Sequence, residues 1–128
     1  KIKQTKMLKG LLDAELAKGN YVIAAGDFNQ TFSNADISNF KQLDGMWKAG
    51  ILDVDHFSDY QMLMDTSVPS CRSLDRAYKG ADPTNFQYYS IDGFIVSKNI
   101  TVKSIKTEDL GFKSSDHNPV LLRASLNP

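Results

Sequence analysis

The sequence predicts an α/β fold in which a mostly mixed or antiparallel sheet is flanked by helices. Residues 4–18 have the apolar spacing of an amphipathic helix, and residues 21–25 form a short, almost continuous apolar run. Further runs of strand length occur at residues 86–97, 101–108 and 120–125. A helix followed directly by a strand, with more strands later in the chain, is typical of layered α/β proteins.

The first helix is predicted by its leucines and by the residues that end it. Gly19-Asn20 supply a C-terminal stop. The run at 21–25 follows immediately and is bounded by turn residues, which predicts a strand covered on both faces. The apolar face of the helix is expected to contain Leu8, Leu11, Leu12 and Leu16.

The middle of the chain carries weaker signals. Residues 38–48 have spacing compatible with a second helix, with Trp47 on its buried face, and Gly50 ends it. The acid-rich segment 53–59 and the stretch up to Pro83 are expected to be loops, of the kind that often bind ligands. Lys98-Asn99 predicts a tight antiparallel hairpin between the strands at 86–97 and 101–108.

Length and composition limit the possible protein classes. The chain has 128 residues, enough for one compact domain, and its hydrophobic content of 41% is that of a globular protein. Lys plus Arg equals Asp plus Glu at 15 each, which argues against a dedicated duplex-DNA binder. The one cysteine, Cys71, excludes a disulfide framework and a zinc site built from cysteines, and is expected to be a small buried side chain.

The first of three polar motifs is Gly26-Asp27-Phe28-Asn29, directly after the predicted buried strand. The ends of strands in α/β sheets commonly carry ligand sites. If the backbone stays extended, Asp27 and Asn29 point in the same direction. The alternative is an Asp/Asn turn that only caps the strand.

The second motif is Ser90-Ile91-Asp92-Gly93-Phe94, where Asp92 interrupts an apolar strand. A carboxylate among buried neighbours needs a partner, because an unpaired buried charge is costly. A histidine is a suitable partner, since a carboxylate fixes the tautomer of the imidazole ring. The alternative is an edge-strand position with Asp92 facing water.

The third motif, Ser115-Asp116-His117-Asn118-Pro119, places a carboxylate beside an imidazole before the last strand. Asp116 is expected to hold a cation while His117 turns toward a substrate. An isolated Asp-His pair is more often a solvated turn. Three polar interruptions at the borders of apolar strands, however, can meet at one end of a sheet.

In this order and at these gaps, the three motifs resemble those of the endonuclease/exonuclease/phosphatase superfamily, which includes DNase I-like nucleases. The resemblance covers residues 4 to about 126 and implies a DNase I-like four-layer α/β sandwich. It also implies divalent-metal-dependent hydrolysis of phosphate esters, with Mg²⁺ or Mn²⁺ as the cofactor. Nucleic acid, phospholipid and small phosphorylated molecules all remain open as substrates.

The resemblance implies a role for each matching residue. Asp27 orients or deprotonates the attacking water, and Asn29 holds a phosphate oxygen. Asp116 helps to bind the metal. His117 contacts the scissile phosphate, and Asp92 holds its imidazole ring in place. Oxygen ligands of this kind suit Mg²⁺, which usually takes one or two protein carboxylates and several waters.

The sequence also departs from the family, because no segment before Asp27 supplies the family's upstream metal-binding Asn and Glu. Residues 1–128 are therefore expected to be the C-terminal half of a single such domain. The expected partners are the missing N-terminal half or, through an exposed sheet face, a second copy of the chain. The fragment alone is expected to be inactive or nearly so. The compartment stays open between cytoplasm and export.

Two basic residues are candidates for contacting the substrate, Arg72 between the first two motifs and Lys113 beside the third. For each, an ordinary surface position is the alternative. The aromatic residues Phe86, Tyr88 and Tyr89 are expected to be core, and His56 is expected to lie in a solvated acidic loop. A metal-dependent phosphoesterase is the leading functional hypothesis, and a non-catalytic binding module on the same fold is the main alternative.

Overall fold

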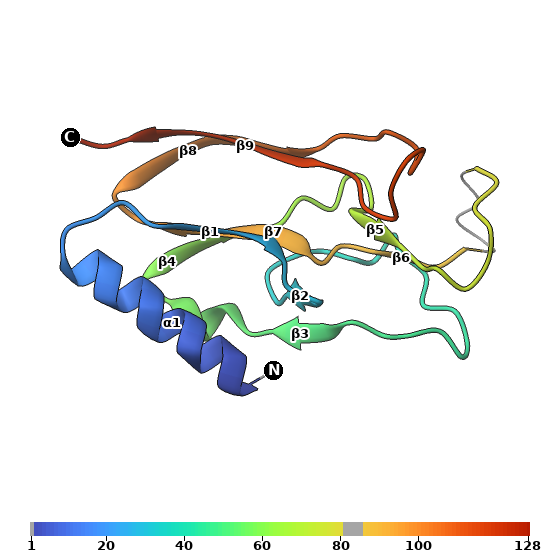
Figure 1. Ribbon diagram of the computed structural model, residues 1–128, viewed down its shortest axis with the longest axis horizontal. Helices are drawn as coiled ribbons and strands as arrows, with labels where there is room; N and C mark the ends of the chain where they lie inside the picture. Colours follow the sequence, from blue (N-terminus) through green and yellow to red (C-terminus); the bar gives the residue numbers. More distant parts are fainter. Residues whose placement is uncertain (1, 81–85) are drawn as a thin grey trace.

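The computed structural model describes residues 2–80 and 86–128 and shows a mixed α/β fold (Figure 1). The described residues form one α-helix, one short 3-10 helix and several small sheets, most of them antiparallel. None of the helices among these residues is long and apolar enough to cross a membrane. In chain order the elements are α1 (Ile2–Ala17), β1 (Ile23–Asp27), β2 (Gln30–Phe32), β3 (Gly50–Leu52), η1 (Val54–Phe57), β4 (Tyr60–Leu63), β5 (Cys71–Arg72), β6 (Tyr88–Tyr89), β7 (Asp92–Ser97), β8 (Ile100–Thr107) and β9 (Val120–Leu126).

The largest sheet has the strand order β1-β7-β4, with both pairs antiparallel. The central strand β7 carries Ile95 and Val96, both fully buried, as expected for branched apolar side chains in a covered strand. Gly93 lies where β7 passes closest to its neighbours. A Cβ atom at this position would lie 2.6 Å from the Leu63 carbonyl oxygen and 3.0 Å from the Phe32 ring. Only glycine fits there without movement of the backbone.

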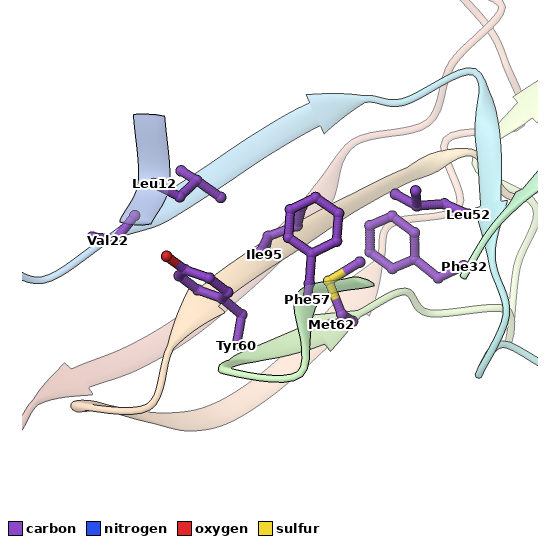
Figure 2. Close-up of a cluster of buried hydrophobic side chains, with 8 residues drawn as sticks. All are labelled: Leu12, Val22, Phe32, Leu52, Phe57, Tyr60, Met62 and Ile95. Carbon is purple, nitrogen blue, oxygen red and sulfur yellow. The ribbon is translucent and has the colours of Figure 1, made fainter. Parts of the chain in front are cut away.

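Helix α1 packs against this sheet through the main hydrophobic core (Figure 2). A hydrogen bond of 2.8 Å, donated by the Tyr60 hydroxyl to Asp13 Oδ1, fixes the helix to β4. The core brings together α1, the β2–β3 pair, η1 and two strands of the sheet. Its buried members are Leu12, Val22, Phe32, Leu52, Phe57, Tyr60, Met62 and Ile95.

Strands β8 and β9 form a long antiparallel ribbon that lies on the other side of the sheet from α1 (Figure 1). The pairing runs from Ile100 opposite Leu126 to Thr107 opposite Val120, with an irregularity between Val102 and Ser104. The loop from 108 to 119, which joins the two strands, contains the third polar motif. Glu108 N–H donates to the Pro119 carbonyl at 2.8 Å and closes the base of this loop.

Two predictions about the strands are wrong, one about pairing and one about length. The predicted hairpin at Lys98-Asn99 does not form, because both edges of β7 are already paired, with β1 and with β4. The chain instead leaves the sheet at this turn, and β8 pairs with β9. The predicted strand 86–97 is divided at Ser90-Ile91 into β6 and β7.

The predicted helix at 38–48 is also absent, and these residues form turns and irregular backbone. The buried Gln87 side chain meets the backbone here: its Oε1 accepts from Leu43 N–H at 2.8 Å, and its Nε2 donates to the Lys41 carbonyl at 3.2 Å. Gly45 has a φ of 75°, which a right-handed helix excludes. Trp47, expected in the core, is 47% exposed.

The predicted strand at 21–25 is present as β1, but it is not covered on both faces. It is an edge strand of the sheet, and Ile23 is 48% exposed. Helix α1 is confirmed, although Leu11 faces solvent instead of the core. The predicted loop from residue 53 to Pro83 in fact contains the short elements η1, β4 and β5, and residues 81–85 lie outside the described part of the chain. The prediction that Cys71, Phe86, Tyr88 and Tyr89 are buried is confirmed.

Candidate active site

The structure brings one side chain from each of the three polar motifs together around the His117 ring. His117 Nδ1 lies 2.8 Å from Asp92 Oδ2, at hydrogen-bond distance. The other ring nitrogen, Nε2, lies 3.7 Å from Asp27 Oδ2 and 4.0 Å from Asp116 Oδ2. The ring is therefore fixed on one side by one carboxylate and faces two more on the other.

The β1–β7 register explains how Asp27 and Asp92 come to share the site. They are direct partners at the end of this antiparallel pair, where Gly26 lies opposite Gly93. Opposite residues of such a pair lie about 4.5–5.5 Å apart. The Ser70 hydroxyl accepts hydrogen bonds from the N–H groups of Ile91 and Asp92 and fixes the start of β7.

The loop that carries Asp116 and His117 is held by backbone pairing to the segment around β5. Cys71 and His117 form an isolated antiparallel bridge. On either side of it, Arg72 N–H donates to the Asp116 carbonyl and Asn118 N–H donates to the Ser70 carbonyl, both at 2.9 Å. The imidazole ring is therefore positioned by two adjacent chain segments and by Asp92.

Asn118 is a structural member of the same motif. Its side chain is buried, and its Nδ2 donates to the Pro69 carbonyl at 3.0 Å while its Oδ1 accepts from Leu110 N–H at 3.2 Å. These bonds tie the loop to the segment around Pro69 and give the buried Asn118 side chain its partners. Asn118 thereby supports the fold of the loop and not the chemistry of the site.

Asp27 and Asn29 lie in the same cleft, but by a turn and not by an extended backbone. Asn29 has a φ of 51°, a left-handed conformation that Asn tolerates well. Its N–H donates to Asp27 Oδ1 at 2.8 Å, as in an Asx turn. The backbone here is therefore the Asp/Asn turn. Asp27 and Asn29 nevertheless both line the cleft.

The charges around His117 favour its protonated form. Burial alone would lower its pKa, but the hydrogen bond and charge of Asp92, followed by the charges of Asp116 and Asp27, raise the pKa of His117 above its ordinary value. Burial also raises the pKa of the Asp92 carboxyl, although the hydrogen bonds from Ser70 and His117 oppose this. The two groups together hold a proton more tightly than they would in water.

The site opens into a cleft of about 530 Å³. Arg72, a candidate for contacting the substrate, lines this cleft. Its Nη1 donates to the Ser73 carbonyl at 2.9 Å, and its guanidinium lies 5.1 Å from the centre of the Tyr78 ring. Its Nε is buried without a hydrogen-bond partner among the described residues. Lys113 is exposed and is not one of the residues that line the cleft.

Trp47 and Cys71 are among the lining residues that were not predicted as part of a site. Trp47 packs edge-on against Tyr89 at 5.1 Å, and the Tyr89 hydroxyl donates to the Trp47 carbonyl. Cys71 lies with its Sγ 3.6 Å from His117 Nε2. The periodicity of apolar residues in the sequence could not show that Trp47 or Cys71 lines a cleft. Cys71 lies in β5, which is only two residues long, and Trp47 lies in irregular backbone.

Among the described residues, two groups of side chains have potential metal-ligand atoms within 4.8 Å of one another. One group is Asp27, Asp92 and His117, and the other is Cys71, Asp116 and His117. Both contain His117, so the ring lies between an oxygen-rich and a sulfur-containing donor set. Comparisons with protein-family models, curated proteins and solved structures find no significant match for this chain.

Proposed function

We propose that the chain carries the phosphate-hydrolysing half-site of a divalent-metal-dependent phosphoesterase, which cleaves phosphodiester or phosphomonoester bonds by attack of water. The observation that carries the proposal is the geometry at His117. Asp92 orients the ring, and Nε2 faces a cleft lined by Asp27 and Asp116. Proton transfer during phosphate hydrolysis requires an acid and a base held in position, and an oriented imidazole beside carboxylate oxygens supplies both.

The donor set suits a hard cation such as Mg²⁺ or Mn²⁺. Asp116 Oδ2 and Asp27 Oδ2 both lie near Nε2, whereas Asp92 Oδ2 is already occupied by the imidazole. Mg²⁺ usually takes one or two carboxylates and keeps its remaining ligands as water. Asp116 would help to hold the ion, which would supply charge neutralisation on the phosphate oxygens.

Each nearby side chain has a distinct part in this proposal. The imidazolium form of His117, which its raised pKa favours, donates from Nε2 to a phosphate oxygen as negative charge develops. Asp27 accepts a proton from the attacking water, and Asn29 lies beside it to contact the substrate. The Arg72 guanidinium in the cleft wall adds positive charge for an anionic substrate.

The finer fold is part of the same proposal: the chain is one half of a DNase I-like four-layer sandwich. The order of helix, three-stranded sheet and second ribbon in Figure 1 supports it. The partner of the chain is then the other half of the domain, which contributes further metal ligands. We expect the chain alone to hydrolyse phosphate esters slowly or not at all.

The test is an assay of the complete reading frame that encodes this chain. Hydrolysis of a generic phosphodiester, of plasmid and single-stranded DNA, and of a phosphoinositide is measured with Mg²⁺ and with Mn²⁺. EDTA should abolish turnover, and His117→Ala should lower it about a hundredfold, the scale expected for loss of a transition-state contact. His56→Ala is the matched control, since His56 lies on η1 outside the cleft and should leave turnover unchanged.

Absence of hydrolysis on every substrate, by folded protein that binds Mn²⁺, would contradict the proposal. The result would then favour a binding module that uses the same cleft. Trp47 and Leu74, 47% and 71% exposed, line that cleft and offer apolar contacts for a partner.

A further inference from the structure

We infer that Cys71, His117 and Asp116 form a second metal site, selective for a thiophilic divalent cation such as Zn²⁺. The three ligand atoms are Cys71 Sγ, His117 Nε2 and a carboxylate oxygen of Asp116, all within 4.8 Å of one another. A mixed set of this kind suits zinc, whereas Mg²⁺ avoids sulfur. One cysteine is sufficient here because nitrogen and oxygen supply the other ligands.

The distance between the sulfur and nitrogen atoms matches tetrahedral coordination. Bonds of about 2.3 Å to sulfur and about 2.0–2.1 Å to nitrogen place these two atoms about 3.6 Å apart at a tetrahedral angle. The observed separation of Cys71 Sγ and His117 Nε2 is 3.6 Å. Asp116 Oδ2, 4.0 Å from Nε2, needs only a small side-chain movement to complete the set. Water fills the fourth position from the open cleft.

Asp92 prepares the histidine for this role. Its hydrogen bond to Nδ1 leaves Nε2 of the neutral ring with the lone pair that a metal requires. Metal-ligating histidines commonly donate their other N–H to a carboxylate, and loss of that carboxylate typically lowers metal affinity about 10- to 100-fold. The Asp92–His117 pair therefore already has the arrangement of a zinc-ligand pair.

The backbone holds the two principal donors in place before any metal binds. Cys71 and His117 are partners in an isolated bridge, and the hydrogen bonds of Arg72 and Asn118 flank it on both sides. Such preorganisation reduces the entropy lost on binding. As the metal–sulfur bond forms, the thiol releases its proton to solvent and the bound species is the thiolate.

The carboxylates around Cys71 have opposite effects on a proton and on a metal. Burial, followed by the charges of Asp116, Asp92 and Asp27, raises the pKa of the Cys71 thiol to about 12. The same negative charges attract a divalent cation. A divalent cation that binds here therefore has to displace the thiol proton.

Occupation of this site has a regulatory consequence, which rests on the proposed function. The cation takes Nε2 of His117 and the carboxylate of Asp116, the groups that the hydrolysis requires. Zn²⁺ should then inhibit turnover that Mg²⁺ or Mn²⁺ supports. Replacement of Cys71 should weaken that inhibition.

The direct test is titration of the chain with Co²⁺, a spectroscopic substitute for Zn²⁺. We expect a near-ultraviolet thiolate-to-cobalt charge-transfer band, which Zn²⁺ displaces. Cys71→Ser and Cys71→Ala should both remove the band and lower Zn²⁺ affinity at least about tenfold. Asp92→Asn should keep the band but lower affinity about 10- to 100-fold, and His56→Ala should change neither.

Tetrahedral Co²⁺ bound without a sulfur band, or equal Zn²⁺ affinity in the wild-type chain and in folded Cys71→Ala, would overturn the inference. The band in the wild-type chain decides the question even if a variant fails to fold. This readout needs no catalysis, so it separates the metal site from the proposed function. A sulfur band in a protein without hydrolase activity would support the site alone, and hydrolysis without the band would support the enzyme alone.

Discussion

At the scale of single residues, the hydrogen bond between His117 and Asp92 determines the protonation of the site. It connects β7 to the loop before β9 and leaves Nε2 facing the cleft. Because Asp92 is its strongest favourable partner, the pKa of His117 depends chiefly on that carboxylate. The charge of the ring can therefore be changed by a substitution that leaves the ring itself in place.

Asp92→Asn should lower the pKa of His117 toward or below its ordinary value of about 6.5. In the wild-type chain the raised pKa adds stability that is fully present below about pH 6.5 and is lost as the pH rises through the folded-state pKa. The variant should lose this pH dependence. An NMR titration of the ring, with His56→Gln to assign the two histidines, measures the pKa, and urea unfolding at several pH values measures the stability. Equal pKa values for His117 in the two proteins would contradict the prediction.

Cys71 gives a second prediction at this scale. Because its pKa is raised to about 12, the thiol is almost entirely protonated at pH 8. Alkylation by iodoacetamide in the folded chain should be at least about a hundredfold slower than in urea-unfolded chain, where a pKa of about 8.5 applies. Mass spectrometry measures both rates. Comparable rates would mean that Cys71 is neither buried nor surrounded by negative charge.

At the scale of elements, two glycines differ in whether their surroundings leave room for a side chain. A Cβ at Gly93 would lie 2.6 Å from a backbone oxygen in β4, whereas a Cβ at Gly10 of α1 meets nothing within 4 Å. Gly93→Ala should therefore lower the free energy of unfolding by about 1–3 kcal/mol through overpacking. Gly10→Ala should raise it by about 0.5–1 kcal/mol through helix propensity. Thermal unfolding of both variants measures these changes in stability. A change in the same direction in both variants would contradict the prediction.

The elements that could be predicted from sequence were those with a local signal. Helix α1 and strands β8 and β9 appear close to their expected places. The pairing of β7 could not be predicted, because it depends on β1 and β4, which lie far from it in the sequence. The helix predicted at residues 38–48 was wrong for a similar reason, since two of the backbone groups there bond to the distant, buried Gln87 side chain.

The candidate site was partly predictable. A carboxylate inside an apolar strand needs a partner, and a histidine is a suitable one, but only the resemblance to the superfamily implied that this histidine is His117. Of the two alternatives for the backbone at Asp27 and Asn29, the turn is the one that forms, and the sequence could not decide between them because it does not reveal a left-handed Asn29. Cys71 gave no signal as a site residue, since its bridge to His117 joins segments 46 residues apart.

At the scale of the whole molecule, apolar side chains remain exposed on β1 and β9. Ile23 is 48% exposed on the edge strand β1, and Leu121 is 52% exposed on β9. Open strand edges with apolar side chains favour association between copies. Self-association of the isolated chain therefore stays a prediction.

Sedimentation velocity at increasing concentration measures this association. The wild-type chain should move toward larger species, and Ile23→Lys with Leu121→Lys should shift the distribution toward monomer. Lys3→Ala, a change of similar size at an exposed position of α1, is the control. A wild-type chain that stays monomeric over the whole range would contradict the prediction.

The bridge between Cys71 and His117 also determines when the site can come into existence. A ribosome completes Asp27, Cys71 and Asp92 well before it reaches His117, and the contacts that position the ring join it to these earlier segments. Contacts between residues so distant in the chain form late, because each one closes a long loop at a cost in entropy. The nascent polypeptide therefore has no assembled centre until β9 has emerged and has paired with β8. We expect assembly of the site to accompany this pairing, and fluorescence of Trp47, in the wall of the cleft, can time it.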